Sequence, residues 1–110
     1  MNRLISGWSS VTIVNNTFTS NGITGIYLRL PTTATVANNI ITKNGNFGIR
    51  ADRSPSLLVM QNTITSNFLG VQVSGNSRAR VLNNVFDGNG VGAVSLQSAL
   101  DVVNNTFVRH

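Results

Sequence analysis

Apolar and polar residues alternate in short stretches along this chain, and turn-forming residues separate the stretches. Val11 and Ile13 flank Thr12 in one stretch, and Ile26 and Leu28 flank Tyr27 in another. A period of two is the pattern of a β-strand that buries one face. No segment keeps the 3.6-residue period of a helix over ten or more residues. We therefore predict an all-β chain built from strands of three to five residues.

The stretches belong to a sequence repeat, marked by Asn-Asn or Gln-Asn followed by two β-forming residues. If the second residue of each pair is position zero, the repeats are separated by 23, 23, 22 and 21 residues. Apolar residues fill positions −5, −3 and +2 in every copy, and Asn recurs at +5 in the first four. The zero positions are Asn16, Asn39, Asn62, Asn84 and Asn105.

Each unit then continues with a small residue and a further short strand. A unit of this length cannot bury its apolar face alone, whereas parallel stacking aligns like positions at about 4.8 Å from unit to unit. We align the four segments that follow the +5 position as Gly25–Leu28, Gly48–Ala51, Gly70–Val73 and Ala93–Leu96.

Two solenoid architectures fit this period. Positions −5, −3, 0 and +2 also satisfy the core of a leucine-rich repeat. Against that alternative, the Leu expected at position −8 is absent from every copy, and the chain has nine Leu in all. The second half of each unit also alternates as a strand does, where a helix or convex turn would be needed.

The pattern V-x-I-x-x-N-x-[IF]-x-x-N-x-x-x-G-I-x-L resembles the repeat of the right-handed parallel β-helix, the pectate-lyase-like solenoids, from about Val11 to Phe107. The resemblance implies a right-handed parallel β-helix of about five coils of 21–23 residues, forming a single domain over residues 1–110. It also implies an extracellular or periplasmic location. The motif residues are structural, so the resemblance is informative about fold and says little about activity.

Position zero is predicted to be a turn residue, because Asn tolerates the left-handed backbone region and bonds to neighbouring backbone. In the resembled family this Asn bends the chain between two strands, and stacked Asn side chains form an inner ladder. Asn16, Asn39, Asn62, Asn84 and Asn105 match that role. Turn formation is expected to account for the Asn residues at +5 as well.

One row of apolar residues does not fit the alternation. Position −2 is predicted to point outward, so that a loop, a missing segment or a partner would cover it; a local bulge that turns the row partly inward is the alternative. The row consists of Val14, Ala37, Met60, Leu82 and Val103.

The resembled family holds its ligands on the outer face of the strand that follows the small residue. Outward positions there are predicted to form one row from Tyr27, Arg50, Gln72 and Ser95, and a second that begins with Arg29 and Asp52. Tyr27 offers a ring face to a sugar, and arginines can bind carboxylates or sulfates with two parallel hydrogen bonds. The alternative is an ordinary solvated face with an Arg29–Asp52 ion pair. We expect these residues to contact an acidic polysaccharide.

Composition restricts the chemistry further. The chain has no Glu and three Asp, and of these only Asp52 falls on the predicted ligand face. Lyases of the resembled family need clustered acids for calcium, and hydrolases need two or three acids together. We therefore predict a non-catalytic module, with a structural or adhesive self-associating solenoid and a polysaccharide lyase or epimerase as alternatives.

Other functions receive less support from the sequence. The absence of Cys excludes disulfides and thiolate metal sites, and no cofactor is expected. The net charge is +5, but the basic residues are not interleaved with aromatic ones as a nucleic-acid surface requires. No stretch approaches the roughly 20 apolar residues of a membrane span. Neither end resembles a cap, so the chain is expected to be a fragment or module of a longer β-helix, or to self-associate through uncapped ends.

Overall fold

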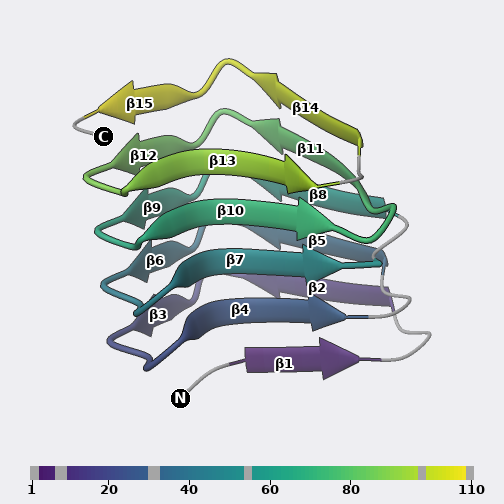
Figure 1. The fold of residues 1–110 in the computed structure, drawn as a ribbon, viewed down its shortest axis with the longest axis horizontal. Helices are drawn as coiled ribbons and strands as arrows, with labels where there is room; N and C mark the ends of the chain where they lie inside the picture. Colours follow the sequence, from purple (N-terminus) through teal and green to yellow (C-terminus); the bar gives the residue numbers. More distant parts are fainter. Residues whose placement is uncertain (1–2, 7–9, 30–32, 54–55, 97–98, 109–110) are drawn as a thin grey trace.

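The computed structural model describes residues 3–6, 10–29, 33–53, 56–96 and 99–108, and within these ranges every regular element is a β-strand. Fifteen strands form three parallel sheets of five strands each (Figure 1). Sheet A contains β1 (Arg3–Ser6), β4 (Thr24–Arg29), β7 (Phe47–Asp52), β10 (Leu69–Ser74) and β13 (Val91–Leu96). Sheet B contains β2 (Ser10–Val14), β5 (Thr33–Ala37), β8 (Ser56–Met60), β11 (Arg78–Leu82) and β14 (Ala99–Val103). Sheet C contains β3 (Thr17–Thr19), β6 (Ile40–Thr42), β9 (Thr63–Thr65), β12 (Val85–Asp87) and β15 (Thr106–Val108).

The chain passes from sheet B to sheet C to sheet A and then begins the next coil directly above. Strands of sheet A run across the front in Figure 1, and those of sheets B and C return behind them while the chain rises. This winding is right-handed, as crossover connections between parallel strands almost always are. The predicted right-handed parallel β-helix of about five coils is thus confirmed.

The interior of the coil is filled by the apolar residues that the alternation assigns to the buried face. In β7, Ile49 and Ala51 are fully buried, whereas the intervening Arg50 is half-buried. Ile41 and Ile64 face the same interior from sheet C and are also fully buried. Because like positions stack, Phe86 and Phe107 lie parallel in adjacent coils, with ring centroids 4.7 Å apart and planes 5° apart.

The first corner, between sheets B and C, holds the predicted asparagine ladder. Asn62 accepts hydrogen bonds at Oδ1 from the backbone N–H and from Nδ2 of Asn39, at 2.9 and 3.0 Å. Its own Nδ2 donates to the Val36 carbonyl and to Asn84 Oδ1, both at 2.9 Å. The chain of bonds extends to Asn16 at one end and Asn105 at the other. The ladder prediction is therefore confirmed.

The left-handed conformation predicted for position zero belongs instead to the residue before it. Positive φ angles of 55–59° occur in all five copies at position −1: Asn15, Asn38, Gln61, Asn83 and Asn104. The prediction was wrong because the bend and the buried amide are placed on consecutive residues. The left-handed residue turns the chain, and the side chain that follows it points into the coil.

A second ladder occupies the corner between sheets C and A, where only turn formation had been predicted. Asn44 Nδ2 donates to Asn67 Oδ1 at 2.9 Å, and Asn67 Nδ2 donates to Asn89 Oδ1 at 3.1 Å. Asn21 donates to Asn44 in the same way, and all four side chains are buried. The residues before them also have positive φ: Ser20, Lys43, Ser66 and Gly88.

The apolar row at position −2 is aligned across sheet B, and its members differ in exposure. Backbone pairing aligns all five residues from Val14 to Val103. Ala37 is buried and Met60 and Leu82 are half-buried, whereas Val14 and Val103 in the outer coils are 41% and 46% exposed. The row alternates with the buried residues at position −3, as the outward prediction requires, and its exposure is lower in the middle of the stack than in the outer coils.

Candidate functional site

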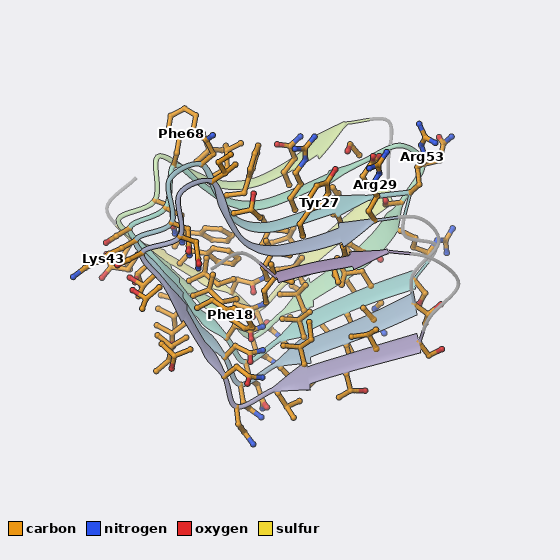
Figure 2. All side chains as sticks on the ribbon, turned by 90° about the horizontal axis from the view of Figure 1, so that it is seen from below. Phe18, Tyr27, Arg29, Lys43, Arg53 and Phe68 are labelled. Atoms are coloured by element: carbon orange, nitrogen blue, oxygen red, sulfur yellow. The ribbon has the colours of Figure 1, made fainter. Side chains whose placement is uncertain are left out.

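The outer side of sheet A carries most of the predicted ligand-binding residues. Inward residues such as Ile26, Leu28 and Val71 are fully buried, and the alternating positions between them point away from the coil. We call the outward side chains of β4, β7 and β10 the sheet A face; they are Tyr27, Arg29, Arg50, Asp52, Gln72 and Ser74, and we include Phe47, at the start of β7, because its ring contacts Arg50. Figure 2 shows Tyr27 and Arg29 on this outer side of the sheet.

Backbone pairing confirms the alignment of two rows on the sheet A face. Tyr27 pairs with Arg50, and Arg50 pairs with Gln72 in the next coil. Arg29 likewise pairs with Asp52, which pairs with Ser74. Neighbours in a row are about 4.8 Å apart, the spacing of adjacent strands. A polymer that lies along the solenoid axis would therefore meet one residue of each row per coil.

Ser95 does not continue the first row as predicted. Gln72 pairs with Val94, whereas Ser95 pairs with Val73, whose side chain is buried. The predicted alignment was wrong by one residue, because Gly92 and not Ala93 is the counterpart of Gly70. The side chain of Ser95 lies outside the described residues. Ser95 is therefore not aligned with Gln72.

Arg50 is held between two aromatic rings of the sheet A face. Its guanidinium carbon lies 4.8 Å from the centroid of the Tyr27 ring in the previous coil and 5.2 Å from the Phe47 ring on its own strand. Each such cation–π contact contributes on the order of 1 kcal/mol at a partly exposed site. Its Nε is buried and has no hydrogen-bond partner among the described residues. An anion would therefore approach Arg50 at its two terminal nitrogens.

Sequence reasoning missed two aromatic residues of this region. Phe47 had no assigned role, yet its ring contacts Arg50. Phe68 lies in the turn between β9 and β10 and is 60% exposed, with its ring against Gly90 of the next coil. The available signal was the position after the +5 Asn, where Gly22, Gly45 and Gly90 stand in the other coils. An exposed Phe in place of a turn glycine is unusual for a purely structural turn.

The ends of the sheet A face differ in character. Figure 2 places Phe68 at the edge where the strands begin, Tyr27 in the middle, and Arg29 and Arg53 at the opposite edge. Arg29 and Arg53 are exposed, and Asp52 between them is half-buried. The surface thus combines apolar ring faces with a net positive charge. Such a combination suits a ligand with both apolar ring faces and negative groups.

Acidic side chains are scarce on the sheet A face. Within the described part of the chain, Asp52 is the one carboxylate of the sheet A face, and glycoside hydrolysis uses two. The described residues contain no group of three or more His, Cys, Asp or Glu side chains placed to hold a metal ion. None of them forms a helix that could span a lipid bilayer.

Comparison with known proteins supports the same architecture. A family model described as a right handed beta helix region matches residues 3–107. No curated protein and no solved structure matches the chain. The matched range includes all three sheets, both asparagine ladders and the sheet A face.

Proposed function

The chain belongs to the right-handed β-helix family, and from this premise we propose that it is a non-catalytic module that binds an acidic polysaccharide along the sheet A face. The observation that carries the proposal is Arg50, whose guanidinium is held between the rings of Tyr27 and Phe47. An extracellular or periplasmic location belongs to the same proposal, since acidic polysaccharides are found there.

Preorganisation of Arg50 is the first argument for binding. A free arginine loses about 2 kcal/mol of side-chain entropy when it is fixed in one conformation. Contacts with Tyr27 and Phe47 already restrict the side chain before a ligand arrives. A planar carboxylate can then accept two parallel hydrogen bonds from the terminal nitrogens. Lys at this position would supply the charge without the planar fork.

The surroundings of Arg50 form the second argument. Gln72 lies one coil further along the row and can both donate to and accept from sugar hydroxyls. The exposed Phe68 ring offers an apolar surface at which a sugar ring can stack, and the Tyr27 ring contributes through its contact with Arg50. Positive charge at Arg29 and Arg53 extends the attraction along the face, in a protein whose net charge is +5.

Calorimetric titration with polygalacturonate and with alginate tests this function. The wild-type chain should bind at least one of them, and Arg50→Ala should weaken binding at least tenfold. Arg50→Lys should fall between the two, because it keeps the charge and loses the two-pronged geometry. Arg78→Ala is the matched control, since Arg78 is an exposed arginine on sheet B, and it should bind as the wild type does.

Thermal unfolding of each variant ensures that a loss of binding is not a loss of fold. Failure of the wild type to bind any acidic polysaccharide would overturn the proposal and leave the self-associating solenoid as the better hypothesis. Release of an unsaturated product during the titration would contradict the non-catalytic assignment and favour the lyase alternative. If Arg50→Ala bound as tightly as the wild type, the binding site could not be the sheet A face.

A further inference from the structure

Sheet C presents a regular array of threonines on its outer face. Its strands contribute ten outward positions, and six of the chain's eleven Thr occupy them. The array is densest over β3, β6 and β9, where five of six outward residues are Thr. We call these six residues the threonine grid: Thr17, Thr19, Ile40, Thr42, Thr63 and Thr65.

Backbone register makes the threonine grid two-dimensional. Thr17 pairs with Ile40 and Ile40 with Thr63, while Thr19, Thr42 and Thr65 form the second row. The rows repeat at about 4.8 Å from coil to coil, and residues two apart on a strand are separated by about 6.7 Å. Fully buried Ile41 and Ile64 lie between the two rows and fix the outward direction of their neighbours.

The side chains of the threonine grid are rigid as well as aligned. β-Branched residues are restricted at χ1, which limits the positions that their methyl and hydroxyl groups can take. Thr65 Oγ1 donates to Thr42 Oγ1 at 2.8 Å, which restricts two adjacent members further. Thr63 and Ile40 are exposed to solvent, Ile40 at 49%. The grid therefore presents methyl and hydroxyl groups to water at regular intervals.

Charge is nearly absent from this side of the molecule. None of the eight Lys and Arg residues falls on the ten outward positions of sheet C, and Asp87 is the one acid there, outside the grid. Lys43 borders the grid at the corner that follows β6 (Figure 2). A surface without cations does not attract nucleic acids or acidic glycans. The aromatic side chains Phe18 and Phe86 alternate inward, so the grid also lacks rings for stacking on neutral sugars.

We propose that the threonine grid binds the surface of ice. Both grid spacings follow from the geometry of parallel strands, and threonine at five of the six positions gives the grid repeated methyl and hydroxyl groups. Fixed methyl groups order the water next to them, and hydroxyls at the same spacing hydrogen-bond to those waters and anchor the ordered layer. A neutral and regular face can both order water at its methyl groups and anchor that water at its hydroxyl groups. The charged sheet A face offers neither arrangement.

Ice recrystallisation assays and thermal hysteresis measurements on the whole chain test the proposal. Wild-type protein should inhibit recrystallisation at micromolar concentration. Thr63→Lys, which places a long charged side chain at the end of the Thr17–Ile40 row, should raise the required concentration at least tenfold. Thr12→Lys is the matched control, because Thr12 is an exposed strand threonine on sheet B, and it should leave the activity unchanged.

Two results would overturn the inference. One is a wild-type chain without effect on ice growth, or one whose effect Thr63→Lys leaves intact. The other is a wild-type dimer in sedimentation analysis that Thr63→Lys converts to monomer without any ice activity, since the grid would then be an interface between two copies. Arg50→Ala should retain full ice activity, which separates this inference from glycan binding.

Discussion

At each of two corners of the coil, consecutive residues meet different physical requirements. Gln61 and Ser66 adopt the left-handed conformation that turns the chain, and both face solvent. Asn62 and Asn67, which follow them, are buried and must satisfy backbone groups left open by the turn. The Asn amide carries both donors and acceptors on a short side chain, whereas Asp has no donor when ionised. Asn is therefore required at the buried position more strictly than at the turn itself.

Replacement of Asn67 by Ala should destabilise the protein as much as replacement of Asn62. Each side chain takes part in four hydrogen bonds, two accepted and two donated. Either substitution leaves buried hydrogen-bonding groups without partners, which should lower the free energy of unfolding by about 3 kcal/mol. Urea unfolding measures this, and Asn46→Ala, at an exposed Asn, should change stability little. If Asn67→Ala were as mild as Asn46→Ala, the second ladder would be only a turn signal.

At the scale of the elements, the coils stack closely because glycine is the second residue of β4, β7, β10 and β13 in sheet A. A Cβ on Gly25 would lie 2.8 Å from the carbonyl oxygen of Gly48, and one on Gly48 would lie 2.6 Å from that of Gly70. Such distances leave no room for any side chain. By contrast, a Cβ on Gly22, in the turn before β4, would meet no atom within 4 Å.

The two kinds of glycine should respond differently to the same substitution. Gly48→Ala should lower the free energy of unfolding by about 2 kcal/mol, because the added methyl group must displace packed backbone. Gly22→Ala should leave stability unchanged or raise it slightly, because it restricts only the unfolded chain. The shift in the urea midpoint compares them directly. Equal effects of the two substitutions would contradict the close stacking of the coils.

The sequence predicted the strands and their order well, since the period-two alternation and the Asn positions repeat five times. It misplaced Ser95 because Ala93–Leu96 alternates as convincingly as the true segment, and a small residue at either Gly92 or Ala93 fits the pattern. The second ladder was missed because an Asn followed by Gly is explained by a turn alone. Its burial depends on the left-handed residue before it, and Ser20, Lys43 and Ser66 give little sign of that conformation.

The candidate site was only partly predictable for a related reason. Outward positions of β4 and β7 follow from alternation, so Tyr27 and Arg50 could be assigned to one row. The contact between Arg50 and Phe47 depends on side-chain direction along the strand, which periodicity does not encode. The exposure of Phe68 depends on a turn that is one residue shorter than in the first two coils.

At the scale of the whole molecule, stacking converts each position of the repeat into a row and each sheet into a distinct surface. Sheet A presents arginines and aromatic rings, whereas sheet C presents the neutral threonine grid. These surfaces face different directions around one core (Figure 2). Substitutions on them should act independently, as distant sites without shared partners do.

Chemical-shift mapping of the isotope-labelled chain, titrated with oligogalacturonate, tests the central claim most directly. Binding at the sheet A face predicts that the largest shifts occur in β4, β7 and β10, with Tyr27, Arg50 and Gln72 among the affected amides. The amide chemical shifts of β5, β8 and β11, which lie in sheet B, should change little. The account would be contradicted if saturating ligand caused no chemical-shift changes, or if the largest changes occurred in amides of sheet B or sheet C.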